Sequence, residues 1–394
     1  MPMTEWKEYK LGEIADITPG FAFKSKDFGQ AGELVVKIKD IAPPYIELAN
    51  ADHVDLSSYD KNKLSKYLLC EGEYVVAMTG ATIGKVGKLK TDKYAYLNQR
   101  VAKIKAKEGV CDDFVYFSIC GDDFQAFIQN NIDSNSAQEN ISANSIGRFP
   151  VLLPSLPTQR RIAAILSSLD DKIDLLLREN ATLEQMAETL FRQWFVVEAK
   201  EEWEEGTISD LIEFNPSRKL PKHTIAPFLE MSNLSTCTFA PTNWYYREFS
   251  SGTKFENGDA LLARITPCLE NGKTAYVDFL RDNQVGWGST EFIVMRSKIG
   301  FHPFFSYIIA KYQDFRDFAE SCMSGSSGRQ RVDVDNLKKY PMAIPDKVTV
   351  ELFNDRIENS VSKMHNNNKQ IQTLIQTRDG LLPKLMSNEI TITK

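Results

Sequence analysis

The chain has 394 residues, which is more than one domain of typical size contains. Of these residues 42% are apolar and 25% charged, a composition that excludes a largely disordered or fibrous protein. Its formal net charge of −6 excludes a surface that is basic throughout, so contact with nucleic acid needs a local basic face. No apolar run approaches the roughly 18 residues that span a bilayer, and the first residues lack the apolar stretch of a signal peptide, so we expect a cytoplasmic protein.

The first 154 residues predict a mixed α+β domain. Short apolar runs predict strands at residues 34–39, 74–78, 85–90 and 100–105, and a helical pattern follows at residues 112–129. Within this half, residues 72–107 contain eight basic side chains against two acidic ones. This segment is therefore the best candidate for a local basic face.

A long helix is predicted over residues 155–198. Pro157 suits a first helical turn that Ser155 precedes, and no proline or glycine follows until Gly206. Apolar side chains recur at helical spacing, with Asn180 in the one polar slot, at Ile162, Ile165, Leu169, Ile173, Leu176, Leu183, Ala187, Leu190 and Trp194. Their mean spacing lies between that of a straight helix and that of a heptad seam.

Residues 199–346 predict a second α+β domain. Strands are expected at residues 260–265, 273–279 and 291–296, and a helix at residues 304–318. The segment 347–394 then contains a second long helix, from about Thr349 to Asp379, which we expect Gly380 to end.

The two halves are related by an internal repeat. Glu5-Trp6-Lys7-Glu8 returns as Glu202-Trp203-Glu204-Glu205, and Arg148-Phe149-Pro150 returns as Lys339-Tyr340-Pro341. At the offset of the second pair, 191 residues, the two long helices align without a gap. Shared order and spacing favour duplication over chance.

The apolar stripes of the two helices predict that the helices pack on each other. At ~1.5 Å per residue the first helix spans ~57 Å, longer than a domain of this size is wide. Asn180 and Asn367 lie on the stripes and either fix the register or face solvent beside the seam. Antiparallel packing would bury a seam of Ile162, Leu169, Ile173, Leu176, Leu183, Leu190, Phe353, Ile357, Met364, Ile371 and Leu374.

The sequence contains no recognisable catalytic centre. Residues 80–86 resemble a phosphate loop but are one residue short and lack the hydroxyl that would bind magnesium, and Pro267 interrupts a second candidate. Residues 42–45 carry alanine where an amino-methyltransferase needs a polar side chain. The six cysteines and four histidines lack metal-ligand spacing, so we expect no metal site and buried free thiols.

The most specific motif is LPSLPTQRRIAAIL at residues 153–166, which continues through residues 170–173, 180–184 and 190–195. It resembles the central spacer of the specificity subunits of Type I restriction-modification enzymes, and residues 381–390 resemble the end of the distal spacer. In the variable halves, residues 79–85 and 98–101 resemble one class of target-recognition domain, and residues 264–273 and 288–292 resemble another. The resemblance covers nearly the whole chain.

This resemblance implies an α+β fold of two tandem target-recognition domains, separated by two long helices packed as an antiparallel coiled coil with a pseudo-twofold repeat. Each half would read one part of an asymmetric, bipartite site in double-stranded DNA. The helices would set the spacing and dock two modification subunits, which methylate adenine with S-adenosylmethionine. Motor-nuclease subunits, which need ATP and magnesium, would complete the restriction complex. The chain itself would be non-catalytic and would bind neither cofactor nor metal.

Base readout needs hydrogen-bonding side chains on loops, and phosphate contacts need basic ones. The candidate DNA contacts of the first half are Thr79, Thr82, Lys85, Lys88, Asn98, Gln99, Arg100, Ser134, Asn135, Ser136, Gln138 and Asn140. Those of the second half are Arg264, Thr266, Asn271, Lys273, Ser289, Thr290, Ser324, Ser326, Ser327, Arg329, Gln330 and Arg331. For each residue alone, a solvated turn explains the same side chain.

Three other functions stay open at this point. A recognition subunit of a related Type II-like or phage-exclusion methyltransferase would differ only in its partner. A coiled-coil scaffold that binds proteins and no DNA fits the acidic total, and its duplex binding would not depend on salt. An enzyme would need a convergent polar pocket that the sequence gives no reason to expect.

Overall fold

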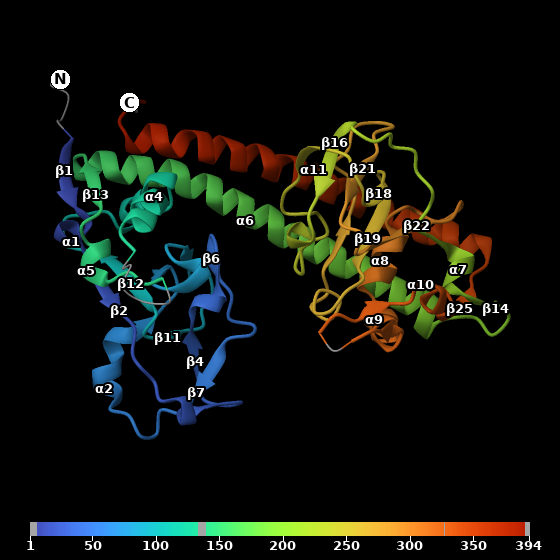
Figure 1. Cartoon of the computed structure of the whole chain (residues 1–394), viewed down its shortest axis with the longest axis horizontal. Helices are drawn as coiled ribbons and strands as arrows, with labels where there is room; N and C mark the ends of the chain where they lie inside the picture. The colour runs from blue at the N-terminus through green and yellow to red at the C-terminus, as the bar shows by residue number, and fades with distance from the viewer. Residues whose placement is uncertain (1–5, 133–138, 327, 391–394) are drawn as a thin grey trace. The chain divides into compact units, whose positions relative to one another are not determined.

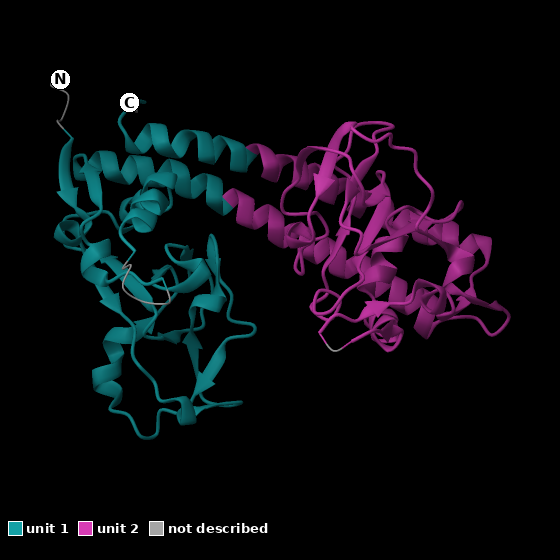
Figure 2. Ribbon diagram, viewed as in Figure 1, with its two compact units in different colours: residues 1–171, 374–394 teal, residues 172–373 magenta. Residues whose placement is uncertain are grey.

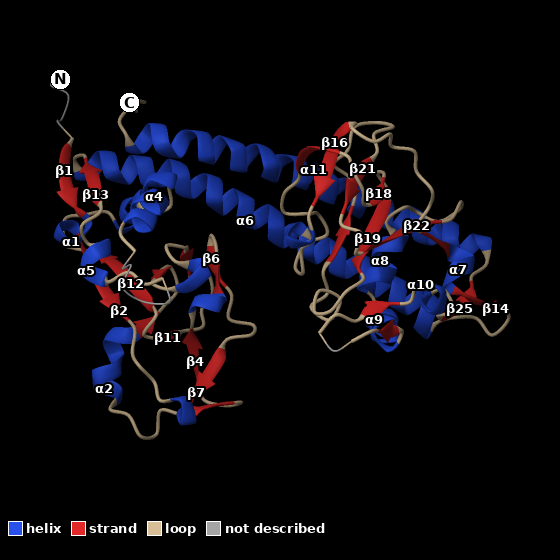
Figure 3. Cartoon of the chain, in the orientation of Figure 1, coloured by secondary structure: helices blue, strands red, loops and turns tan. Residues whose placement is uncertain are grey.

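The computed structural model describes residues 6–132, 139–326 and 328–390. The chain divides into two compact units, residues 1–171 with 374–394 and residues 172–373 (Figure 2). Two long helices contribute residues to both units, α6 (Leu156–Arg192) and α11 (Lys347–Met386) (Figure 1). Both units combine helices and strands (Figure 3), so the predicted fold of two α+β domains with two long helices is confirmed.

The described residues of the first unit form two sheets and one strand pair. The larger sheet has the order β2 (Ala15–Pro19), β12 (Val101–Ala106), β9 (Tyr74–Ala77), β10 (Val86–Lys88), β6 (Tyr45–Ile46), β5 (Ile41–Ala42). The second sheet has the order β3 (Phe28–Gly29), β7 (Asp52–Val54), β4 (Glu33–Val36), β11 (Ala95–Leu97), β8 (Leu68–Leu69). Strand β1 (Lys7–Lys10) pairs with β13 (Pro150–Leu153).

Five short α-helices accompany the sheets of this unit in its described residues. They are α1 (Leu11–Ile14), α2 (Lys61–Leu64), α3 (Asp112–Ser118), α4 (Asp122–Asn130) and α5 (Ala143–Ile146). The single helix predicted over residues 112–129 is wrong, because the extended backbone of Gly121 separates α3 from α4. The break lets Phe114 of α3 and Phe124 of α4 enter the same buried cluster.

The described residues of the second unit also form two sheets. The first has the order β15 (Ile212–Phe214), β22 (Phe292–Ser297), β19 (Asp259–Ala263), β20 (Thr274–Tyr276). The second has the order β17 (Tyr245–Glu248), β16 (Ile225–Leu229), β21 (Gly286–Gly288), β18 (Thr253–Phe255). Two strand pairs are β14 (Glu204–Thr207) with β25 (Pro341–Ile344) and β23 (Met323–Ser324) with β24 (Arg331–Val332). The helices are α7 (Ile208–Leu211), α8 (Phe305–Lys311), α9 (Gln313–Ser321) and α10 (Val334–Leu337). The helix predicted over residues 304–318 is also divided, because Tyr312 has an extended backbone.

The two units share one strand order. The sheet β15-β22-β19-β20 matches β2-β12-β9-β10, and β17-β16-β21-β18 matches β7-β4-β11-β8. In each second sheet the same central pair is parallel, β4 with β11 and β16 with β21. The strand pair β14–β25 likewise corresponds to β1–β13. The internal repeat of the sequence therefore extends to the sheet topology.

Helix α11 continues past the residue that the sequence predicted as its end. It runs through Gly380 and Pro383 to Met386. The reason is burial, since Leu385 is 2% exposed and lies in the core cluster of the first unit, with Leu381, Leu382 and Met386 packed against it. This packing outweighs the roughly 1 kcal/mol that glycine costs inside a helix. None of the described helices is long and apolar enough to cross a membrane.

The two long helices run antiparallel where they pack within each unit. In the second unit Trp194, in the π-helical turn Gln193–Val197 that follows α6, contacts Phe353 of α11, with 6.2 Å between ring centroids, and Asn180 of α6 contacts Asn367 of α11. In the first unit Arg378 Nη1 of α11 lies 2.9 Å from Asp170 Oδ1 of α6. All eleven residues named for the seam are buried or half-buried.

Candidate nucleic-acid interface

In the first unit, the loops that carry the candidate residues meet at one edge of the larger sheet. The end of β9 lies beside the start of β12, with Ala77 opposite Val101, and the start of β10 lies beside β9, with Val86 opposite Val76. A bridge between Thr79 and Asn140 brings a third segment to the same edge. This edge, formed by residues 78–85, 98–100 and 140, is called the first reading edge.

The side chains of the first reading edge differ in how available they are. Lys85, Gln99 and Arg100 are exposed, and Thr82, Asn98 and Asn140 are half-buried. Thr79 is 1% exposed and its hydroxyl donates to the backbone carbonyl of Glu139 at 2.9 Å. Thr79 therefore supports the loop and does not present its side chain to a ligand in this structure.

Lys88 lies away from this edge. It ends β10 opposite Tyr74, the first residue of β9, so it is at the other end of the sheet. Its ammonium group pairs with Asp113 at 2.7 Å and lies over the ring of Tyr116. The structure does not bring Lys88 together with Lys85 and Arg100.

Most cations of the basic segment 72–107 pair with acids of the same unit. These pairs are Lys88 with Asp113, Lys90 with Asp171, Lys103 with Glu73, Lys105 with Asp112 and Lys107 with Asp16. Within the described part of the chain, Lys85, Lys93 and Arg100 form no ion pair. The positive charge that the sequence spreads over the whole segment is thus concentrated, at this edge, in Lys85 and Arg100.

The second unit forms a matching edge from different residues. The end of β19 lies beside the start of β22, with Ala263 opposite Phe292, and Thr274 at the start of β20 pairs with Leu262. Ile265 forms a bridge with Arg331. This edge, formed by residues 264–273, 289–291, 324–326 and 328–331, is called the second reading edge.

Four candidate side chains of the second reading edge hold its loops together. Arg264 Nε donates to the carbonyl of Val332 at 2.9 Å, and the Thr266 hydroxyl donates to the carbonyl of Gln330 at 3.2 Å. Lys273 Nζ donates to the Met231 carbonyl at 3.1 Å, and Ser289 Oγ accepts from the backbone of Glu291 at 3.1 Å. The exposed candidates here are Asn271, Thr290, Ser324, Ser326, Arg329 and Arg331, and Gln330 is half-buried.

Glu291 is a residue of this edge that the sequence analysis missed. It accepts hydrogen bonds from Nε and Nη2 of Arg331 at 2.7–3.0 Å. Its place in the motif Gly288-Ser289-Thr290-Glu291-Phe292 was the available signal, but an acidic residue is not an obvious member of a DNA-binding surface. The candidates Ser134, Asn135, Ser136, Gln138 and Ser327 lie outside the described residues.

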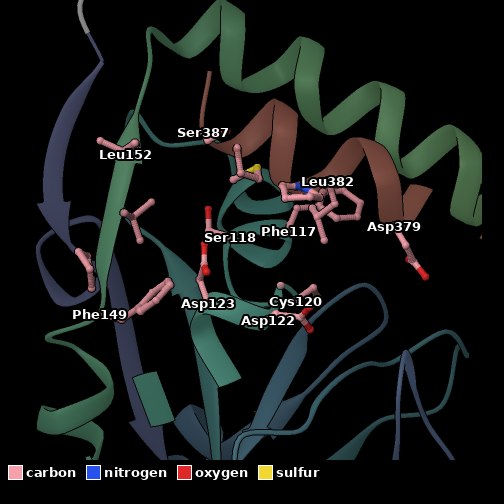
Figure 4. Close-up of a pocket in the computed structure, with 15 residues that line it drawn as sticks. Phe117, Ser118, Cys120, Asp122, Asp123, Phe149, Leu152, Asp379, Leu382 and Ser387 are labelled. Carbon is pink, nitrogen blue, oxygen red and sulfur yellow. The ribbon is translucent and has the colours of Figure 1, made fainter. Parts of the chain in front are cut away.

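Each unit also contains a cavity at matched positions of the repeat. The first cavity, of 560 Å³, lies between the α3–α4 turn, β13 and the end of α11, as Figure 4 shows. The second cavity, of 610 Å³, lies between α6, α8 and the start of α9. Nine lining positions correspond at the offset of 191: Phe117, Cys120, Gly121, Asp122, Asp123, Asp379, Leu382, Pro383 and Ser387 match Ile308, Lys311, Tyr312, Gln313, Asp314, Glu188, Phe191, Arg192 and Val196.

The charged lining of the cavities is not arranged as a metal centre. Among the described residues, no group of three or more His, Cys, Asp or Glu side chains is placed to hold a metal ion. The expectation of buried thiols is wrong, because Cys70, Cys120 and Cys237 are exposed and Cys111, Cys268 and Cys322 are half-buried. These six residues lie in loops and near helix ends, where apolar neighbours cover them only in part.

Comparisons with known proteins point to one family. The sequence profile of the family described as Type I restriction modification DNA specificity domain matches residues 3–185 and 200–375. The specificity subunit of the Type I restriction enzyme MjaIX of Methanocaldococcus jannaschii is 23% identical over an alignment of 434 residues, covering 99% of this chain and 97% of that protein. The specificity subunit of EcoAI of Escherichia coli is 32% identical over 157 residues, 36% of this chain and 25% of that protein.

A solved structure has the same fold. The crystal structure of the S subunit of a Type I restriction-modification system from M. genitalium superposes with a TM-score of 0.55 at 15% sequence identity. The match covers 100% of this chain and 98% of that chain.

Proposed function

We propose that this chain, which belongs to the family of Type I restriction modification DNA specificity domains, selects the DNA sequence on which a restriction-modification complex acts. Two recognition domains, residues 1–154 and 199–346, would each read one part of an asymmetric, bipartite site. The observation that carries the proposal is the repeated reading edge, which has the same strand order in both units but different polar side chains. The chain would be a recognition subunit without a catalytic step of its own.

The exposed side chains of the two reading edges divide into two roles. Lys85, Arg100 and Arg329 are cations that can contact phosphates and fix the position of the duplex, without carrying sequence information. Gln99 and Asn271 can hydrogen-bond to base edges, as amide side chains do with adenine. Because the two edges present different amides and hydroxyls, we expect the two half-sites to differ in sequence.

We further propose that the two matched cavities bind two copies of one partner, the modification subunit that uses S-adenosylmethionine. Both cavities have acidic side chains at corresponding positions, Asp123 with Asp314 and Asp379 with Glu188. Both also have a large apolar side chain at the position of Leu382 and Phe191. A partner segment with an apolar side chain beside a basic one would complement either cavity.

Mapping of methylated adenines tests the reading function. The full chain is produced with its modification subunits in a host that lacks adenine methylation. We expect methylation at one bipartite motif, with one adenine in each half, and none when the chain is omitted. Methylation that does not depend on this chain would contradict the proposal. Duplex binding with no salt dependence would instead favour a protein scaffold.

The stoichiometry of the complex tests the cavities. Asp123→Lys and Asp314→Lys place a cation at matched, exposed positions. We expect each single variant to bind one modification subunit in place of two, and the double variant to bind none, as measured by native mass spectrometry. Asp92→Lys, an exposed position outside both cavities, is the control and should bind two. Two bound subunits in the double variant would exclude the cavities as docking sites.

A further inference from the structure

The second reading edge contains an arginine whose guanidinium is held on one side only. Glu291 immediately precedes β22 and Arg331 opens β24. Arg331 Nε donates to both carboxylate oxygens of Glu291, at 2.9 and 3.0 Å, and Nη2 donates to Oε1 at 2.7 Å. Of the described residues, only Glu291 hydrogen-bonds this guanidinium.

This geometry leaves a second donor edge available. A guanidinium has five N–H donors in a fixed plane, and Glu291 uses the side that carries Nε and one hydrogen of Nη2. The end of the fork, with both hydrogens of Nη1 and the outer hydrogen of Nη2, stays unused. The side chain of Arg331 is 46% exposed, whereas that of Glu291 is 21% exposed. The carboxylate therefore lies behind the arginine and the unused donors remain accessible.

The backbone of Arg331 is fixed as well. Its neighbour Val332 donates to the Arg264 carbonyl at 2.9 Å and accepts from Arg264 Nε at 2.9 Å. On the other side, the backbone N–H of Gln330 donates to Thr266 Oγ1 at 2.9 Å. Because both neighbours of Arg331 are hydrogen-bonded to residues 264–266 and its guanidinium to Glu291, the Arg331 side chain loses little further conformational freedom when it binds a ligand.

Building on the proposed function, we propose that Glu291 is a positioning residue that aims the free donor edge of Arg331 at a pair of acceptor atoms on DNA. Two such pairs have the right chemistry, O6 and N7 of guanine in the major groove and two oxygens of one phosphate. Guanine fits better than phosphate, because the pairing with Glu291 offsets the positive charge of Arg331 but leaves the direction of its unused N–H donors unchanged. Long-range attraction to phosphate is weakened by that pairing, whereas a directional contact with a base edge is kept.

The neighbouring arginine makes a matched comparison. Arg329 is exposed, and its side chain forms no hydrogen bond or ion pair with another described residue. An exposed, unpaired cation is suited to a phosphate, which carries no sequence information. Arg329 and Arg331 lie two residues apart, so their alanine variants separate general attraction to DNA from readout at one base.

The experiment uses the assembled complex and the site found by methylation mapping. Binding constants are measured for duplexes with single base changes in each half, for Arg331→Ala, Glu291→Gln, Arg329→Ala and the double variant of Glu291→Gln with Arg331→Ala. Asp335→Asn on α10, which alters an exposed ion pair with Lys338, is the control for loss of a surface carboxylate. Thermal unfolding of every variant is measured alongside.

We expect Arg331→Ala to lose about tenfold or more in affinity and to become indifferent to the base at one position of one half-site. Glu291→Gln should relax the same position by a smaller factor, with unfolding unchanged, and the double variant should be no worse than Arg331→Ala alone. Replacing the guanine there by 7-deazaguanine should weaken the wild type but not Arg331→Ala. A merely structural role for Glu291 would not produce this base-specific pattern.

Three other outcomes are informative. If Arg331→Ala and Glu291→Gln weaken all duplexes equally and lower the salt slope by about one, the acceptor pair belongs to a phosphate and the positioning role stands. If both variants keep the affinity and base preferences of the wild type, the inference is wrong although the proposed function survives. If the wild-type complex has no base preference at all, the proposed function itself fails.

Discussion

Asn367 of α11 donates hydrogen bonds to Asn180 Oδ1 of α6 at 2.9 Å and to Glu179 Oε2 at 2.8 Å. Both asparagines are buried, at 0% and 3% exposure. The two polar residues therefore meet inside the seam and do not face solvent beside it. Asn367 Oδ1 has no hydrogen-bond partner among the described atoms, so this polar layer is only partly satisfied. Such a layer favours one register of the helices at some cost in stability.

Replacing one member of this layer should destabilise the second unit. Asn367→Ala leaves Asn180 without its donor in a buried site, which we expect to cost about 1–3 kcal/mol in the free energy of unfolding. The double variant of Asn180→Leu with Asn367→Leu should be at least as stable as the wild type, because no buried polar group is left unpaired. Glu179, which also loses a donor, is 40% exposed and keeps Lys363 Nζ at 3.5 Å. Urea unfolding measures both. Asn366→Ala, at the exposed neighbouring position, should change little, and a large loss there would contradict the explanation.

The stability of the second unit should depend on pH through Glu184. This residue of α6 is 6% exposed and accepts a hydrogen bond from the Tyr307 hydroxyl at 2.7 Å, with Lys311 Nζ at 3.9 Å and Glu188 nearby. Burial raises the pKa of its carboxyl to about 7, from an ordinary value of 4.5. The folded state therefore holds a proton that the unfolded state releases between these two values, so stability falls as the pH rises from about 4.5 through 7.

Glu184→Gln removes this dependence, because the amide is neutral at every pH and still accepts the Tyr307 hydrogen bond. At pH 8 we expect the free energy of unfolding of Glu184→Gln to exceed that of the wild type by up to about 3 kcal/mol, so that the variant unfolds at a higher temperature. At pH 5 the two proteins should differ little. Thermal melts across this range measure the effect. Glu202→Gln, at an exposed position, is the control. A constant difference between Glu184→Gln and the wild type at all pH values would show that Glu184 is ionised throughout.

Lys85 and Arg100 of the first reading edge should contribute to DNA binding, whereas Lys88, at the other end of the sheet, should not. Lys85→Ala and Arg100→Ala should each weaken duplex binding by the assembled complex and reduce the slope of log affinity against log salt by about one. Lys88→Ala should leave that slope unchanged, because Lys88 lies at the other end of the sheet and pairs with Asp113. Equal effects of all three variants would mean that the basic segment acts by its total charge.

The continued helix α11 can be tested at Gly380. A Cβ added there would meet nothing within 4 Å, and the residue does not have a positive φ. Gly380→Ala should therefore stabilise the first unit by about 0.5–1 kcal/mol, through reduced freedom of the unfolded chain. Calorimetry checks this. If Gly380 ended the helix in the left-handed conformation, as the sequence predicts, alanine would destabilise it.

The parts of the fold that the sequence revealed are those with long-range periodicity. The stripe from Ile162 to Trp194 repeats over many turns, and the matched offset of 191 needs only the order of motifs. In the second sheet of each unit only β4 was predicted, because the strands are two to five residues long, as in β3 and β8, and show no alternation. Gly121 marked a helix break that could have been read, but nothing local distinguishes Tyr312.

The candidate sites were predicted by residue type, which does not reveal burial or pairing. Thr79 and Lys85 belong to one loop, yet the first is buried and the second exposed. Lys88 and Arg100 lie in one basic segment, yet only Lys88 is paired with an acid. The contact between Glu291 and Arg331 joins residues that are 40 positions apart. Such distinctions depend on the tertiary fold and cannot be read from spacing along the chain.

The division of the chain into units has a consequence for biosynthesis. The second unit is one continuous segment, residues 172–373, so all its residues are synthesised before residues 374–394 of the first unit. The first unit needs residues 374–394, and Leu385 fills a core that also contains Ile162 and Leu166. During translation, residues 1–171 of the first unit are therefore synthesised first but cannot complete their core until residues 374–394 follow. Until then the first unit leaves apolar core surface exposed. A nonsense mutation near codon 374 should accordingly destabilise the first unit more than the second unit, although the second unit directly precedes the stop.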